Sequence, residues 1–195
     1  MFHPYGNVAY LFIQMGAYRG GANTFAVIGL ASKPLHVFGK PRFECEWIPK
    51  TPSSGRSIKG KAHRMLRDWG YGRVYTVVVI NCTFSQSVGT DGSGGELILH
   101  ALRGNQFGTA ERIVALTEGK STYNASVYSQ APPYDYLYCG SSLYGDLNPQ
   151  RIREWMAYHA KFFGPRSHFV FHDAGGVHSQ VRKVLEPWIR AGHVM

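Results

Sequence analysis

Two adjacent prolines, Pro132 and Pro133, separate two different sequence patterns and constrain the fold more than any other feature. Proline fixes its own backbone and donates no hydrogen bond, so Ser129–Pro133 ends any strand ladder and predicts a linker. Before the linker, short apolar runs are separated by turns rich in Gly and Ser, whereas after it apolar runs alternate with helical periodicity. We therefore expect two domains, residues 1–128 and 134–195, joined by the linker 129–133.

The N-terminal region contains seven short runs with the composition of β-strands. Tyr75–Phe84 is continuous enough to be buried on both faces, and Gly16–Gly21 predicts a glycine-rich turn. Strands at this spacing favour a β-sandwich of roughly 120 residues. The runs are Val8–Met15, Thr24–Leu30, Leu35–Phe38, Phe43–Ile48, Tyr75–Phe84, Glu96–Leu102 and Glu111–Leu116, the last two of which also fit short helices by periodicity alone.

The C-terminal region alternates strands with helices. Asn148 caps a helix that has Pro149 at its first position and Gly164 as its stop signal. Strand, helix, strand, helix and strand in this order predict the opening of a parallel α/β sheet, and so few strands imply a fragment that ends partway through its second domain. The expected elements are Tyr134–Cys139, Pro149–Phe163, Phe169–Phe171, Val177–Arg190 and a third strand that begins at Gly192.

The chain of 195 residues carries a formal charge of +9, and 14 of its 21 basic residues precede Tyr134. This surplus indicates an anionic neighbour such as a nucleic acid, an acidic polysaccharide, a membrane surface or a nucleotide-sugar phosphate. The densest basic cluster, Arg56–Arg67, is interpreted as a solvated loop or short helix rather than an anion site. Nucleic-acid binding ranks low, because only 17% of the residues are charged and no recognition motif accompanies them.

Three cysteines, Cys45, Cys82 and Cys139, lack the spacing of a structural zinc site. In an oxidising compartment, Cys45 and Cys82 would cross-link two strands and leave Cys139 free. Asn81 and Asn124 begin N-x-S/T sequons, which are acceptors only in a secretory lumen. No signal peptide and no run of eighteen apolar residues is visible, so any membrane anchor would lie outside this chain.

The turn after Phe169–Phe171 is the main candidate for a binding site, because α/β sheets bind ligands beyond the carboxyl ends of their strands. His172 and Asp173 stand at this edge, and the turn Cys139-Gly140-Ser141 would lie beside it. The glycines after Asp173 allow close backbone approach, and free N–H groups at the next helix would favour an anion or a hydroxyl. The Asp173 carboxylate suits ribose hydroxyls or a uracil N–H. The alternative is that Asp173 caps the next helix and His172 packs against the sheet.

Catalytic motifs are absent from the sequence. The serines form no nucleophile elbow, and the histidines form no HExxH zinc motif. No D-x-D motif, which would hold a metal against a sugar-nucleotide diphosphate, occurs anywhere in the chain.

Several long stretches resemble a known family of enzymes. YDYLYCGSSLYGDLNPQRIREWMAYHAKFFGPRSHFVFHDAGG resembles the start of the catalytic domain of plant glycosyltransferase family 92, in particular of its β-1,4-galactan galactosyltransferases, or galactan synthases. AYLFIQMGAYRGG and GLASKPLHVFGKP are similar to the carbohydrate-binding β-sandwich that precedes that domain.

The resemblance implies an N-terminal fragment with the first βαβα units of a Rossmann-like GT-A domain. It implies transfer of galactose from UDP-galactose to the β-1,4-galactan of pectin in cell walls, by a type II membrane protein of the Golgi lumen. Manganese, its D-x-D ligands and the catalytic base would lie outside this chain, so the fragment is expected to be inactive. A non-catalytic galactan- or pectin-binding protein is the alternative, and homo-oligomers stay open.

The same resemblance assigns roles to individual residues. Cys139, Gly140, Ser141, His172 and Asp173 would contact the nucleotide sugar, and the sequons and the disulfide would suit the secretory lumen. The basic first domain would face acidic pectin. Aromatic side chains that would stack on sugar rings, or alternatively lie in the core, are Tyr10, Phe12, Tyr18, Trp47 and Trp69.

Overall fold

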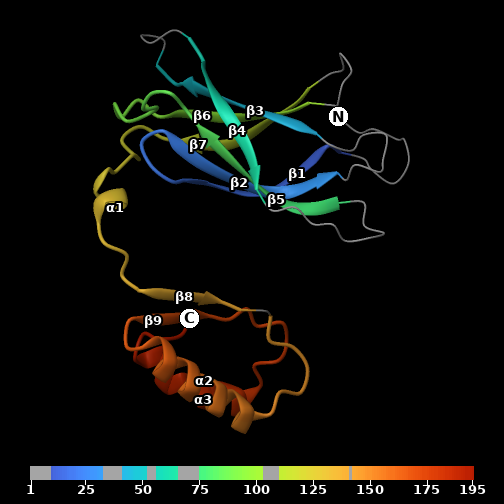
Figure 1. The fold of residues 1–195 in the computed structure, drawn as a ribbon, viewed down its shortest axis with the longest axis vertical. Coiled ribbons are helices and arrows are strands. Elements are labelled where there is room, and N and C mark those ends of the chain that lie inside the picture. The colour runs from blue at the N-terminus through green and yellow to red at the C-terminus, as the bar shows by residue number, and fades with distance from the viewer. Residues whose placement is uncertain (1–9, 33–40, 52–55, 66–74, 103–109, 141) are drawn as a thin grey trace. The chain divides into compact units, whose positions relative to one another are not determined.

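A computed structural model of the chain describes residues 10–32, 41–51, 56–65, 75–102, 110–140 and 142–195. The chain divides into two compact units, Met1–Gln130 and Ala131–Met195, which we call unit 1 and unit 2. Unit 1 is built from strands, and unit 2 from strands and helices (Figure 1). In the part of the chain that the structure describes, every helix is too short or too polar to serve as a membrane span.

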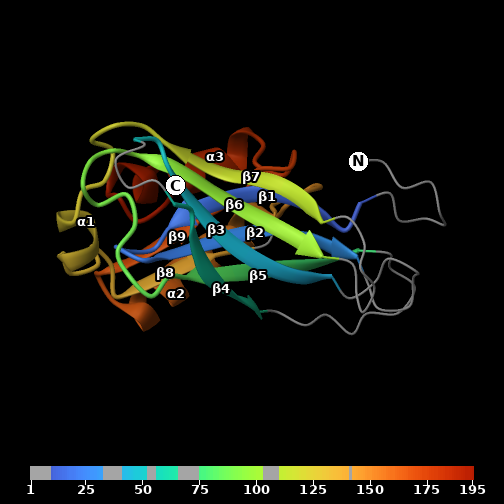
Figure 2. The ribbon, with the colours of Figure 1, turned by 90° about the horizontal axis from the view of Figure 1, so that it is seen from above.

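Unit 1 contains one antiparallel sheet of seven strands in the order β1-β2-β5-β4-β3-β6-β7. Figures 1 and 2 show two layers, with β1, β2 and β5 in one, β3, β6 and β7 in the other, and β4 running between them. Its elements are β1 (Phe12–Arg19), β2 (Thr24–Ser32), β3 (Arg42–Pro49), β4 (Ile58–Met65), β5 (Tyr75–Thr83), β6 (Gly95–Leu102), β7 (Glu111–Glu118) and the short helix α1 (Ser126–Ser129).

The two outer strands of this sheet, β1 and β7, approach each other through side chains. The Gln14 amide donates to the Ala115 carbonyl oxygen at 2.7 Å, and the Leu11 N–H donates to the Glu111 carboxylate. The sheet is therefore nearly a barrel. This architecture is consistent with the predicted β-sandwich.

The core of unit 1 lies between the two layers and contains large aromatic side chains. Trp47 of β3 is fully buried and stacks on Phe25 of β2 at a centroid distance of 5.5 Å. A disulfide joins Cys45 of β3 to Cys82 of β5, with the two Cα atoms 5.8 Å apart. This bond links one layer to the other at the pair of cysteines that the sequence singled out.

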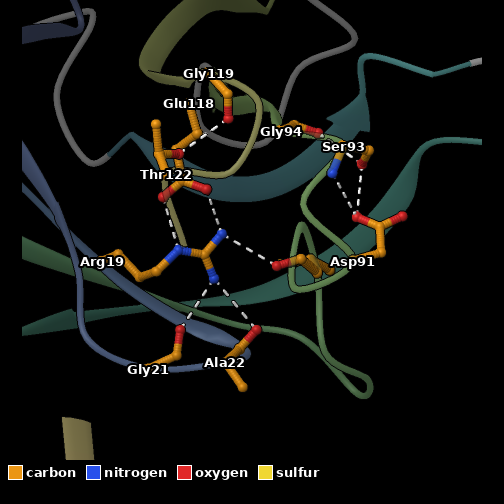
Figure 3. A network of polar contacts seen from close by, with 10 residues as sticks. Arg19, Gly21, Ala22, Asp91, Ser93, Gly94, Glu118, Gly119 and Thr122 are labelled. Carbon is orange, nitrogen blue, oxygen red and sulfur yellow. Dashed lines mark hydrogen bonds and ion pairs between the residues drawn. The ribbon is translucent and has the colours of Figure 1, made fainter. Parts of the chain in front are cut away.

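Arg19, at the end of β1, is the centre of a polar network that closes one end of unit 1 (Figure 3). Its guanidinium forms two hydrogen bonds with the Glu118 carboxylate, at 2.6 and 2.7 Å, and the two side chains are only 5% and 12% exposed. Its other N–H groups donate to the carbonyl oxygens of Gly21, Ala22 and Val88. All five guanidinium donors are therefore used, as a buried arginine requires.

The structure corrects three expectations for unit 1. The described part of the basic cluster, residues 56–65, contains β4 rather than a loop or a helix, and Ile58, Gly60 and Ala62 are less exposed than the lysines between them. The turn predicted at Gly16–Gly21 begins later, because β1 continues to Arg19 after an irregularity in its pairing and the chain turns between Gly20 and Thr24. The candidate strand Leu35–Phe38 lies outside the described residues.

The third correction concerns β5, which was expected to be buried on both faces. Val78 and Ile80 face the core, but Val77 is 53% exposed. The run of β-branched residues therefore reflects strand propensity as well as burial. Glu96–Leu102 and Glu111–Leu116 are confirmed as strands.

Unit 2 pairs two short parallel strands and packs helices against them. Asn148 caps α2 by accepting N–H groups of Gln150 and Arg151, and the helix ends before Gly164, which has a positive φ of 84°. Pro187 lies within α3 without ending it. The elements are β8 (Tyr136–Cys139), α2 (Pro149–Phe163), β9 (Ser167–Val170) and α3 (Ser179–Arg190), and Val194 adds a parallel bridge beside β9.

Candidate functional site

The segments that follow β8 and β9 lie side by side, and the backbone of Leu143 makes three hydrogen bonds between them. Its N–H donates to the His172 carbonyl oxygen at 2.7 Å, and its own carbonyl oxygen accepts the N–H groups of Ala174 and Gly176 at 2.8 and 3.1 Å. These bonds extend the parallel pairing of the strands beyond their ends, as the bridge between Leu143 and Asp173 also shows. The predicted binding edge is therefore an ordered structure.

Asp173 organises the turn between β9 and α3. Its Oδ1 accepts the N–H groups of Gly175 and Val177 at 2.9 and 3.1 Å, and Gly175 has a positive φ of 90° that favours glycine. The N–H of Val177, followed by that of Gly175, lowers the pKa of Asp173, so this exposed carboxylate stays ionised well into the acidic range. The N-cap of α3 is His178, so Asp173 fixes the turn before the helix but does not cap it.

The other predicted residues of this site gather at the same edge. The Cys139 sulfur lies 3.7 Å from Nε2 of His172, and Cys139 is a free, exposed thiol. The Gly140 N–H donates to the Val170 carbonyl oxygen at 3.2 Å. His172 is exposed and contacts the sheet through Cys139 at the end of β8. Ser141 lies outside the described residues.

The backbone N–H groups of this turn have partners already. Those of Ala174 and Gly176 bind Leu143, and those of Gly175 and Val177 bind Asp173. These partners leave none of the N–H groups from Ala174 to Val177 for a ligand, whereas the first turn of α3 has no side-chain cap, so the expected anion or hydroxyl site at the start of that helix stays a prediction. The side chains that this edge presents to a ligand are an ionised carboxylate, an imidazole and a thiol, and the carboxylate suits hydroxyl and N–H donors.

The predicted sugar-stacking aromatics fall into different environments. Trp47 and Phe12 are buried in the core of unit 1, so neither forms part of a stacking platform. Both face inward because strand alternation places them on the core side of β3 and β1. Tyr18 is 62% exposed and Tyr10 is 39% exposed, whereas Trp69 lies outside the described residues.

The two sequon asparagines also differ. Asn124 is exposed in the segment before α1, where its Oδ1 accepts from the N–H and hydroxyl of Ser126. Asn81 lies within β5, between its pairing partners Ala26 and His63. Asn124 is thus the more accessible acceptor.

Sequence reasoning did not find a group of polar residues on the outer face of unit 1. Nε2 of His100 on β6 lies 2.8 Å from the Glu46 carboxylate on β3, and hydrogen bonds from Ser57 and His100 lower the pKa of Glu46. The alternation of Phe43–Ile48 already placed Glu44 and Glu46 on one face. Their neighbour His100 comes from a strand 54 residues away, which no local pattern reveals.

The described side chains form no group that could bind a metal ion. Among the ranges that the structure covers, no three His, Cys, Asp or Glu residues lie close enough together to hold a metal ion.

Comparison with known proteins gives close relatives along the whole chain, although no family model matches it. Galactan beta-1,4-galactosyltransferase GALS1 of Arabidopsis thaliana is 61% identical over 194 residues, which is 100% of this chain and 38% of that protein. GALS3 and GALS2 of the same plant, which carry the same enzyme name, are each 54% identical over 99% of this chain. The chain spans 38–39% of the length of these relatives. The predicted resemblance to galactan galactosyltransferases is thereby confirmed.

Proposed function

Since the chain is homologous over its whole length to galactan β-1,4-galactosyltransferases, we propose that it forms part of such an enzyme. The proposed reaction transfers galactose from UDP-galactose to the β-1,4-galactan side chains of pectin during cell-wall synthesis. The single observation that carries the proposal is the identity of 61% across 194 residues, which covers both units. In this proposal unit 1 contacts the glycan, and unit 2 begins a GT-A nucleotide-binding domain.

The geometry of unit 2 supports this division of roles. Parallel strands connected through a helix place Cys139 and Asp173 at one edge, which is where α/β domains bind nucleotides. An ionised Asp173 is able to accept hydrogen bonds from ribose hydroxyls or from the uracil N–H. Cys139, Gly140, Ser141 and His172 complete the proposed nucleoside side of the site.

Manganese, which the resemblance implies, does not fit the residues described. Within the described ranges no cluster of three metal-binding side chains exists, and the sequence has no D-x-D motif. We therefore assign its ligands, and the catalytic base, to residues outside this chain. The chain by itself is proposed to be inactive as a transferase.

The decisive experiment is titration calorimetry of the chain with UDP, with and without manganese. We expect weak, manganese-independent binding that the Asp173→Asn variant reduces severalfold. Asparagine retains a side-chain oxygen for the N–H groups of Gly175 and Val177, so this variant removes the charge and keeps the turn. Asp146→Asn, on the exposed segment after β8, is the matched control and should bind as the parent does. No UDP binding, or equal losses in both variants, would refute the assignment.

A second candidate function is non-catalytic binding of galactan or pectin. The observation that favours it is that unit 1 has its own hydrophobic core and its own disulfide. Affinity electrophoresis in galactan gels distinguishes the two, because retardation of a chain that binds no UDP supports the second function alone.

The proposed location is the Golgi lumen, with a membrane anchor outside this chain. The Cys45–Cys82 disulfide and the exposed Asn124 sequon suit an oxidising, glycosylating compartment. Expression through a secretory pathway followed by mass analysis of the Asn124 peptide tests this location.

A further inference from the structure

The outer face of unit 1 carries a hollow of about 330 Å³ that none of the assignments above uses. Its volume lies in the range of small-molecule pockets, about 300–1,000 Å³. The hollow spans three neighbouring strands, β4, β3 and β6, because β3 lies between the other two in the sheet. The side chains that surround it include Glu44, Glu46, Lys59, His100, Leu102 and Ala110.

Strand alternation explains why polar side chains converge here. Cys45 and Trp47 of β3 face the core, so Glu44 and Glu46 face outward. Two residues along a strand are about 7 Å apart, which separates the two carboxylates by a distance comparable with the width of a sugar ring. Lys59 lies directly opposite Glu46 in the pairing of β3 with β4.

The side chains around the hollow differ in whether other residues hydrogen-bond to them. Glu46 is fixed by His100 at 2.8 Å and by a hydrogen bond from Ser57, so its carboxylate is ionised and oriented before any ligand arrives. Among the residues that the structure describes, the side chains of Glu44 and Lys59 have no hydrogen-bond or ion-pair partner. An acceptor, two residues along β3, and a donor, on the neighbouring strand β4, are therefore available beside a preformed carboxylate.

The mixture of charges selects the ligand class. Two carboxylates disfavour phosphate, sulfate or uronate, and the adjacent Lys59 disfavours a cation. The described part of the chain also lacks a three-ligand metal group. An uncharged ligand with several hydroxyl groups satisfies acceptors and donors together, since each hydroxyl both donates and accepts.

We propose that the hollow formed by Glu44, Glu46, Lys59 and His100 binds one uncharged sugar residue of the glycan that unit 1 contacts. This inference rests on the proposed function for the choice of a sugar. It moves the glycan-binding surface of unit 1 from the predicted aromatic platform to a carboxylate-lined hollow on the face of β3, β4 and β6.

The test is titration calorimetry of the whole chain with β-1,4-galactotetraose. Glu44→Ala should weaken binding on the order of tenfold, which is the loss expected for a hydrogen bond to a charged group. The matched control is Glu96→Ala on β6, outside the residues that line the hollow, and it should bind as the parent chain does. Melting curves of both variants check that unit 1 stays folded.

Two further arms make the test decisive. Tyr18→Ala probes the aromatic alternative and should leave binding unchanged, and tetragalacturonate should bind at least about tenfold more weakly than the neutral probe. The proposal is overturned if galactotetraose fails to bind, if Tyr18→Ala and not Glu44→Ala removes binding, or if the acidic probe binds more tightly. No donor nucleotide is present, so the result is independent of whether unit 2 binds UDP.

Discussion

Replacing Arg19 with methionine would test how unit 1 is held together, because all five N–H donors of this guanidinium are paired. Methionine keeps a long apolar stem but leaves the Glu118 carboxylate and the carbonyl oxygens of Gly21 and Val88 without the Arg19 donors, whereas the Ala22 carbonyl oxygen keeps the Val88 N–H. Removing one partner of a buried ion pair costs about 3–5 kcal/mol. A whole domain is stabilised by only about 5–15 kcal/mol, so the loss would be a large share of the stability of unit 1.

Hydrogen exchange monitored by mass spectrometry would measure this loss in each unit separately. We expect Arg19→Met to lower the protection of core peptides from β5 and β6 by about 4 kcal/mol and to leave unit 2 peptides unchanged. The matched control is Arg166→Met, which removes an ion pair with Asp135 whose side chains are 54% and 57% exposed. Exposed pairs of this kind contribute about 0.2–1 kcal/mol.

A double-mutant cycle with Glu118→Gln decides whether the ion pair itself carries the effect. Residues in one buried network show coupling of about 0.5–3 kcal/mol, so the double variant should be more stable than the sum of the single losses predicts. Our reasoning would be refuted by an Arg19→Met loss below about 1 kcal/mol, or by two losses that simply add.

Other predictions test packing, titration and thiol chemistry. A Cβ at Gly95 would overlap the Trp47 ring, so Gly95→Ala should cost about 1–3 kcal/mol in chemical unfolding, whereas Gly119→Ala in the loop after β7 should cost much less. The pKa of Glu46 is lowered in the folded chain, so its carboxylate stabilises the fold above the ordinary glutamate pKa, and this stabilisation is lost as the pH falls through the folded pKa. Glu46→Gln should therefore make the free energy of unfolding depend less on pH in the acidic range. Native chain should take up one equivalent of iodoacetamide, at Cys139, and three after reduction and unfolding, as counted by intact mass; more than one in the native state would contradict the disulfide.

The limits of sequence reasoning in unit 1 are clearest in β4. Its inward positions hold Ile58, Gly60 and Ala62, which bury little apolar surface, and its outward positions hold Lys59 and Lys61. The pattern is weak because β4 forms through pairing with β3 and β5, which supply the partners for its backbone. Local composition therefore suggested a loop where long-range pairing makes a strand.

The same limit applies to the polar contacts of unit 1. Arg19 and Glu118 are 99 residues apart, and His100 and Glu46 are 54 apart, so neither pair leaves a local signal. In unit 2 the important signals are local. Asn148 and Gly164 set the ends of α2 through their own backbone and side-chain chemistry, and the sequence predicted both.

The order of strands and helices in unit 2 was enough to predict where the candidate site lies. The hydrogen bonds and charges of that site could be described only from the structure. Sequence reasoning expected free N–H groups at the start of α3 but did not foresee that Leu143 and Asp173 accept the N–H groups of the turn before it. This turn uses its own backbone donors internally and presents an ionised carboxylate that is held in a fixed position. The carboxylate is suited to the hydroxyl and N–H donors of the proposed nucleoside ligand. The two roles of Asp173 are separable experimentally, since Asp173→Asn should weaken UDP binding with little change in the turn, whereas Asp173→Ala should disturb both.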